Sequence, residues 1–132
     1  MGQYGKAAIK AAGLVAGQKT TPQDAWKKAI RKSTASESSQ KKPCPRSVFL
    51  GLCEGGMIDG VDSGEYDAGE KNKAYAIEAV RILQKDKSQI KNKTKLWKKV
   101  MKELGEETSK SQNNQMDVVT SLWSEKLIAV VP

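Results

Sequence analysis

The chain has 132 residues, 38% of them hydrophobic, and a formal net charge of +8 at pH 7. This length suits one compact domain spanning residues 1–132, and the composition excludes a disordered chain. The sequence contains no histidine, which excludes histidine bases, Cys–His pairs and histidine metal ligands. No apolar run approaches the roughly 18 residues of a membrane span, so we expect a soluble, cytoplasmic protein that binds no membrane.

The first two predicted helices have clear apolar faces. We expect the first over about residues 3–15, where apolar side chains recur at helical spacing. The second has the best-marked start in the chain, because Thr21 can cap it and Pro22 suits its first turn. Trp26 is expected to face the core from this second helix.

The next segment is rich in serine and then in proline. Residues 33–40 interrupt the apolar periodicity, and we interpret them as a flexible loop. A third helix is expected over about residues 45–54, where Gly55 and Gly56 offer a left-handed stop. Cys44 would then lie just before the start of this helix.

An acidic, glycine-containing linker over about residues 59–70 joins the two halves of the chain. Its spacing approaches that of an EF-hand loop, with Asp59 at position 1 and Glu70 at position 12. Position 3 is Val61, which offers no side-chain oxygen, and we therefore predict no metal and no cofactor. Asp67 is expected to cap the following helix.

Three further helices are expected after the linker. Their apolar faces include Ala76 and Leu83 in the first, Trp97 and Leu104 in the second, and Trp123 in the third. A polar stretch precedes the last helix, in the same place as the serine-rich segment of the first half. The second half of the chain therefore follows the same plan as the first.

The helical unit occurs twice in the chain. Three pairs of segments match: 25–30 with 96–101, 52–58 with 122–128 and, more weakly, 8–12 with 76–80. We therefore predict an all-α fold of six main helices, arranged as two tandem three-helix units about a pseudo-twofold axis. The first repeat covers about residues 3–61 and the second about residues 71–131.

The strongest charge cluster lies in the second half. Residues 85–102 hold eight lysines and a single acid, Asp86. Such a patch can attract phosphate or another anion. The candidate contact residues are Lys85, Lys87, Lys91, Lys93, Lys95, Lys98 and Lys99. The alternative interpretation is a solvated surface whose charge maintains solubility.

Two motifs typical of nucleic-acid-binding proteins find little support. Trp26 and Trp97 each precede a lysine pair, as stacking platforms for single strands do, but both lie on the apolar faces of their helices. A helix-turn-helix needs a tight turn, whereas a long segment separates the last two helices of each unit. Arginine is rare, with three among 23 basic residues, which argues against base-specific recognition.

The two cysteines, Cys44 and Cys53, are too few for a disulfide scaffold. Cys44 lies beside a helix start and close to Arg46, and such surroundings can activate a thiol. It is the candidate reactive thiol, although no residue completes a catalytic set around it. We therefore predict that the protein is not an enzyme and that Cys44 belongs to a structural turn.

A resemblance to a known family rests on four segments: residues 3–10, 21–30, 49–58 and 114–123. On these segments the chain resembles a small family of uncharacterised bacterial helical proteins, a domain of unknown function, over nearly its whole length. The resemblance implies a small bacterial helical protein. It implies no active site.

Three hypotheses of function follow. The first is a non-enzymatic helical module that binds a protein partner, or a second copy of itself, through the groove between the repeats. The second is an accessory protein that binds nucleic acid nonspecifically through the lysines of residues 85–102. The third, a cysteine-dependent enzyme, depends on Cys44 alone. A filled seam between the repeats would count against the first.

Overall fold

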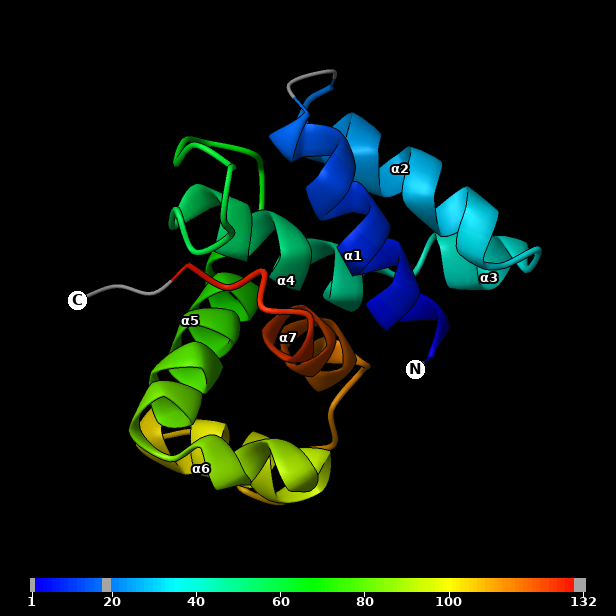
Figure 1. Cartoon of the computed structure of the whole chain (residues 1–132). Helices are drawn as coiled ribbons and strands as arrows, with labels where there is room; N and C mark the ends of the chain where they lie inside the picture. The colour runs from blue at the N-terminus through cyan, green and yellow to red at the C-terminus, as the bar shows by residue number, and fades with distance from the viewer. Residues whose placement is uncertain (1, 18–19, 130–132) are drawn as a thin grey trace.

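The computed structural model describes residues 2–17 and 20–129 and contains six long helices (Figure 1). They are α1 (Gln3–Ala16), α2 (Pro22–Ser33), α4 (Pro43–Glu54), α5 (Glu70–Lys85), α6 (Lys93–Glu103) and α7 (Gln115–Ser124). Two short elements, α3 (Glu37–Gln40) and the 3₁₀ helix η1 (Lys87–Lys91), complete the order. The predicted all-helical class is confirmed. None of the described helices is both long and apolar enough to cross a membrane.

The local signals at helix starts give mixed results. At α2 the prediction is confirmed, because Thr21 Oγ1 accepts a hydrogen bond from the backbone N–H of Asp24 at 3.2 Å and Pro22 occupies the first turn. At α5 the prediction is wrong. Its N-cap residue is Gly69, whereas Asp67 takes a left-handed backbone conformation, with φ of 61°, instead of capping.

The serine-rich segment is more ordered than predicted. Residues 33–40 include the single turn of α3, where Ser36 Oγ accepts a hydrogen bond from the N–H of Ser39 at 3.3 Å. The flexible loop is therefore wrong in part, since a serine that interrupts one helix can also cap a short one. Helix α4 begins at Pro43, two residues earlier than predicted, because proline fits the first helical turn.

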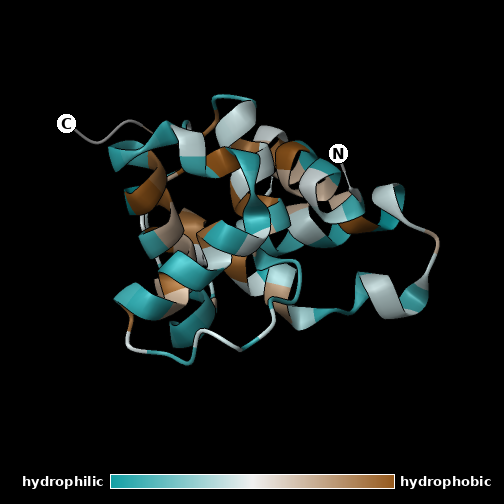
Figure 2. Ribbon diagram, turned by 90° about the horizontal axis from the view of Figure 1, so that it is seen from below, coloured by the Kyte–Doolittle hydropathy of each residue, from teal (hydrophilic) through white to brown (hydrophobic). Residues whose placement is uncertain are grey.

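Helices α4 and α7 lie at the centre of the molecule. Helix α1 packs against α2 and α7, whereas α4 packs against α5 and α7. Helix α6 packs against α5 and lies at the opposite end of the molecule from α2 (Figure 1). Hydrophobic residues gather on the inward faces of the helices and hydrophilic residues on the outward faces (Figure 2).

The core contains both repeated tryptophans. Trp26 is 2% exposed and Trp97 is 3% exposed, so their predicted burial is confirmed. Trp123 packs against the core but stays partly exposed. Leu104, predicted as a core residue, is 37% exposed, because α6 ends at Glu103 and the chain leaves the helix there.

Helices α4 and α7 end with the same turn. The N–H of Met57 donates back into the last turn of α4 at 2.9 Å, and Gly56 has a positive φ of 66°. The N–H of Leu127 donates back into α7 at 3.0 Å, and Lys126 has a φ of 60°. The glycine stop predicted at Gly56 is confirmed, and α7 makes the same Schellman turn without a glycine.

The segments after these two helices meet in an isolated antiparallel bridge between Ile58 and Ile128. Two backbone hydrogen bonds flank the bridge, with N···O distances of 2.9 and 2.8 Å: Asp59 to Leu127 and Ala129 to Met57. Both bridging isoleucines are buried. The bridge therefore closes the surface of the core between α4 and α7.

Helices α4 and α5 approach each other closely at Gly51. A Cβ atom at this position would lie 2.7 Å from the Cα atom of Lys73 on α5. Only glycine permits such an approach, at the cost of some helix propensity. The contact brings Lys73 within reach of Glu54, one turn further along α4.

The two buried tryptophans differ in their hydrogen bonding, which gives a testable prediction. The indole N–H of Trp97 donates to the carbonyl of Lys110 at 2.7 Å, whereas that of Trp26 has no partner among the described residues. Trp97→Phe should therefore lower the free energy of unfolding by about 1–2 kcal/mol more than Trp26→Phe, because only the former leaves a carbonyl without its donor. Urea unfolding of both variants measures the difference, and equal losses would contradict it.

Candidate functional site

The outer face of α6 carries a row of lysines. Leu96, Trp97, Val100 and Met101 are buried on its inner face. Four exposed lysines recur at i, i+3, i+4 and i+7 on the opposite face, and we call them the α6 stripe: Lys95, Lys98, Lys99 and Lys102. None of them forms an ion pair with another described residue. The stripe therefore presents four exposed lysines to solvent, of which Lys99 lies near the Asp86 carboxylate.

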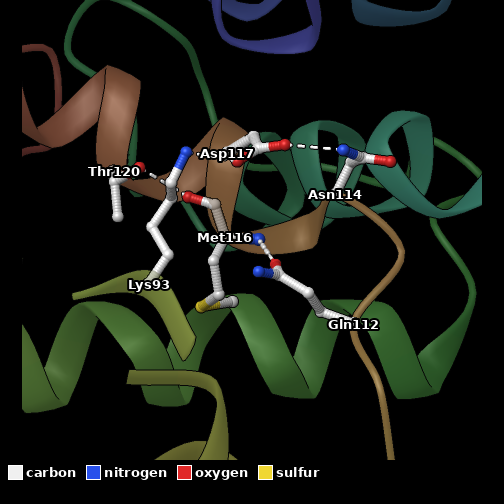
Figure 3. A network of polar contacts seen from close by, with 6 residues as sticks. All are labelled: Lys93, Gln112, Asn114, Met116, Asp117 and Thr120. Carbon is white, nitrogen blue, oxygen red and sulfur yellow. Dashed lines mark hydrogen bonds and ion pairs between the residues drawn. The ribbon is translucent and has the colours of Figure 1, made fainter. Parts of the chain in front are cut away.

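One member of the predicted lysine patch is neutralised. Lys93 Nζ lies 2.7 Å from Asp117 Oδ1 on α7 (Figure 3). The other oxygen of this carboxylate accepts a hydrogen bond from Asn114 Nδ2, also at 2.7 Å. Lys93 therefore ties the start of α6 to α7. Lys85 at the end of α5 and the η1 residues Lys87 and Lys91 remain exposed.

The single acid of the patch, Asp86, is used in local structure. Hydrogen bonds from Ser88 and Gln89, with a smaller effect of the Lys99 ammonium, lower the pKa of Asp86. The Asp86 side chain also accepts the backbone N–H of Ser88 and so caps η1. The carboxylate is ionised at neutral pH and offsets one charge among the exposed lysines.

Helix α2 carries a second basic row that the sequence analysis did not assign as a site. Lys27, Lys28 and Arg31 are exposed on the side opposite Trp26, and we call them the α2 stripe. They form no ion pair with the residues that the structure describes. The signal was the repeated Trp-Lys-Lys segment, in which both the tryptophan and the following lysines recur.

The acidic linker folds over a cleft of about 620 Å³ beside α4 and α5. Glu54 on its wall makes three polar contacts. Its Oε2 atom accepts the backbone N–H groups of Tyr66 and Ala68 at 2.8 and 3.1 Å, and its Oε1 atom lies 3.1 Å from Lys73 Nζ. Desolvation alone would raise the pKa of Glu54, but these three contacts together lower it.

The cleft does not assemble a set of metal ligands. Three exposed acids, Glu65, Asp67 and Glu70, lie on its rim, while both oxygens of Glu54 are already paired. Val61, which occupies position 3 of the EF-hand spacing, is buried. Among residues 2–17 and 20–129 no group of three Asp, Glu, Cys or His side chains is placed to hold an ion.

A smaller hollow of about 340 Å³ lies between α6 and the segment before α7, with Lys98 on its rim. Three of its lining side chains, those of Trp97, Lys110 and Gln112, form hydrogen bonds. The Tyr75 hydroxyl donates to Glu106 Oε1 at 3.0 Å, and Lys110 Nζ donates to the same hydroxyl at 3.2 Å. The interaction with Tyr75, chiefly the hydrogen bond, raises the pKa of Lys110, and the Glu106 charge adds a smaller effect. These hydrogen bonds and that of the Trp97 indole fix the segment before α7 against α5 and α6. Lys98 forms no ion pair with a described residue.

The two thiols differ in access. Cys53 is fully buried in α4, and burial, with a contribution from Glu54, raises its pKa to about 12. Cys44 is partly exposed and lies inside the first turn of α4, not before it as predicted, because the helix begins at Pro43. Both cysteines are free thiols. Cys53 cannot act as a nucleophile at neutral pH. Cys44 remains the candidate reactive thiol, and no hydrogen bond or ion pair within the described residues joins it to a catalytic base.

The seam between the two halves of the chain is filled. Leu50 and Leu52 of α4, Leu122 of α7 and the bridging Ile58 and Ile128 are all buried. The one large apolar side chain exposed among the described residues is that of Leu104, which lies at the end of α6. These five side chains are therefore not available to a protein partner or second copy that docks in this seam.

Comparison with known proteins identifies a family. A model described as a family of unknown function (DUF6979) matches residues 1–129, and the chain belongs to that family. The resemblance inferred from the sequence is thereby confirmed as to family. No curated protein and no solved structure matches the chain significantly. Membership of this family assigns no activity to the chain.

Proposed function

We propose that this member of a family of unknown function is a non-enzymatic accessory protein that binds double-stranded nucleic acid without sequence preference. The observation that carries the proposal is the α6 stripe, whose four exposed lysines share one helix face without an ion pair among the described residues. Lysine ammonium groups act as point charges toward phosphates. Release of counterions from the duplex supplies the driving force.

The side chains around the stripe favour a duplex over a single strand. Proteins that bind single strands stack bases on exposed aromatic rings. Here Trp97, the aromatic residue of α6, is buried on the inner face of its helix, opposite the stripe. Trp26 is buried in the same way on the inner face of α2. Arginine, which reads guanine edges, contributes only three of the 23 basic residues. Contact with the phosphate backbone accounts for this composition.

The hypothesis of a groove-binding protein module receives less support. It needs an open apolar surface between the repeats, and buried leucine and isoleucine side chains occupy that seam. Specific protein interfaces have a core of buried apolar anchors. Exposed lysines at the rim of an interface contribute little affinity to a protein partner, whereas the same lysines are the principal contacts to phosphates.

We also propose that the fold arose as a tandem duplication, with α1, α2 and α4 related to α5, α6 and α7 by a pseudo-twofold axis. The Ile58–Ile128 bridge supports this, because it joins residues at the same position of the two repeats. The packing of α4 on α5 and of α1 on α7 is also reciprocal. A cytoplasmic location agrees with two free thiols and with a nucleic-acid ligand. A bacterial origin stays a prediction.

The proposal predicts strong salt dependence of binding to a random-sequence duplex. Four lysine–phosphate contacts correspond to a slope of about −3.6 in a plot of log K against log salt concentration. The variant K95Q/K98Q/K99Q/K102Q should lose this part of the slope, as measured by fluorescence anisotropy with a labelled duplex of about 20 base pairs. Failure of the unmodified protein to bind at the lowest salt concentration would refute the proposal.

A matched control separates the stripe from overall charge. The variant K10Q/K41Q/K71Q/K126Q removes four exposed lysines elsewhere and has the same net charge as the stripe variant. It should retain most of the slope of the wild-type protein. An equal loss in both variants would mean that net charge alone attracts the duplex and that α6 is not the site.

A further inference from the structure

We infer that the protein holds two duplexes at once, one on the α6 stripe and one on the α2 stripe, and so acts as a bridge between nucleic-acid segments. This inference rests on the proposed function. The α2 residues Lys27, Lys28 and Arg31 match three of the α6 lysines at the repeat offset: Lys98, Lys99 and Lys102. The same spacing from a buried tryptophan places each set on the outer face of its helix.

The two helices offer comparable charge. Apart from the neutralised Lys93, α6 carries four cations and one acid, Glu103. Helix α2 carries four cations, including Lys32, and one acid, Asp24. The exposed lysines of η1 and of the end of α5 add to the α6 side only. We therefore expect two sites of the same kind, of which the α6 site binds more tightly.

The positions of the helices decide between one long site and two separate sites. Helices α2 and α6 lie at opposite ends of the molecule, with α4 and α7 between them (Figure 1). Both turn their tryptophan faces inward, so the two stripes face away from each other. A straight duplex cannot touch both faces. Wrapping it around a domain of about 14 Å radius of gyration would need bending far beyond the stiffness of short DNA.

Three basic side chains outside the two stripes are paired with acids. Lys73 is paired with Glu54, Lys93 with Asp117, and Arg81 lies 3.9 Å from Glu78. The acidic linker, with Glu65 and Glu70 exposed, also lies on the body of the molecule. Acidic side chains repel phosphates. A nucleic-acid backbone that follows one stripe is therefore not guided continuously to the other stripe.

A capture experiment tests bridging. A biotinylated random duplex on beads is mixed with the protein and with a fluorescent duplex of unrelated sequence, at about 50 mM salt. The protein should retain the fluorescent duplex on the beads, and a large excess of protein should abolish retention, because each duplex then carries its own protein molecules. Retention should also vanish when salt is raised to about 300 mM.

Two stripe variants identify the surfaces. K27Q/K28Q/R31Q should keep single-duplex binding in an anisotropy assay, because the α6 stripe is intact, but lower capture of the second duplex at least about tenfold. K98Q/K99Q/K102Q should lower capture as much and should also weaken single-duplex binding, because it removes three residues of the tighter site. The control K10Q/K41Q/K71Q should capture normally. Normal capture by the α2 variant would overturn the inference, because bridging would then come from self-association of the protein. Single-duplex binding without capture by the wild-type protein would overturn bridging and leave the proposed function standing, whereas absence of any binding would refute both.

Discussion

Replacing Glu54 by alanine is expected to lower the free energy of unfolding at pH 7 by about 2–4 kcal/mol. The side chain is 13% exposed and gathers three donors: the backbone N–H groups of Tyr66 and Ala68 and the ammonium of Lys73. Alanine would leave all three without their acceptor. Urea unfolding measures the loss, and Glu65→Ala is the matched control, because Glu65 lies on the same cleft, is exposed and makes no contact of this kind.

The stabilisation that Glu54 provides is expected to depend on pH. The folded state lowers the pKa of Glu54 below its ordinary value of 4.5. The unfolded chain therefore binds a proton more readily, and the stabilisation present above that value is lost as the pH falls through the folded pKa. The stability difference between wild type and Glu54→Gln should shrink between neutral pH and about pH 3. A difference that stays constant over this range would show that the charge of Glu54 does not contribute.

The role of Glu54 could not be read from the sequence, and the reason is physical. Signals such as Thr21 before Pro22 act within a few residues. There the backbone geometry of a helix start determines which side chain reaches which backbone N–H group. Glu54 bonds residues that lie 12 and 14 positions away, across a linker whose path depends on the packing of α4 against α5. The sequence predicted Asp67 only as the cap of the following helix, whereas the linker is held by hydrogen bonds to Glu54 on α4.

The same distinction explains the lysine patch. Helical spacing was enough to place Lys95, Lys98 and Lys99 on one face, because the buried residues of α6 fix the opposite face. Spacing could not reveal that Lys93 is neutralised, since its partner Asp117 is 24 residues away on another helix. A count of charges along the sequence therefore includes Lys93 among the unpaired lysines, although it is paired with Asp117.

The α2 stripe was missed for a different reason. A count of charges in a window favours residues 85–102, and α2 lacks the additional lysines that precede α6. The repeat carried the missing information, because Lys27 and Lys28 recur as Lys98 and Lys99. The tryptophans of this repeat indicate buried core positions, which explains the recurrence only in part. When surface charges recur together with core residues, the repeat indicates a shared charged surface as well as a shared core.

The single domain predicted from length can be tested through the shared core. Leu52 of α4 and Leu122 of α7 begin the matching sequence segments 52–58 and 122–128, and both are fully buried. Substituting either by alanine is expected to cost about 2–5 kcal/mol, because each leaves a cavity in a packed core. Since α4 packs against α5 and α7, and α1 packs against α7, neither half can bury its apolar faces without the other. Damage in one half should therefore destabilise both.

The buried thiol of Cys53 reports on the first half. In a Cys44→Ser background it is the one remaining thiol of the chain, and it reacts only when α4 opens. Leu122→Ala, which lies in the second half, should accelerate labelling of Cys53 roughly hundredfold for a loss of about 3 kcal/mol. Circular dichroism of the helices should show one unfolding transition that shifts by the same free energy. If Cys53 stayed protected while part of the helical signal was lost, the halves would be separate folding units, and the closed seam between α4 and α7 would not bind them into one domain.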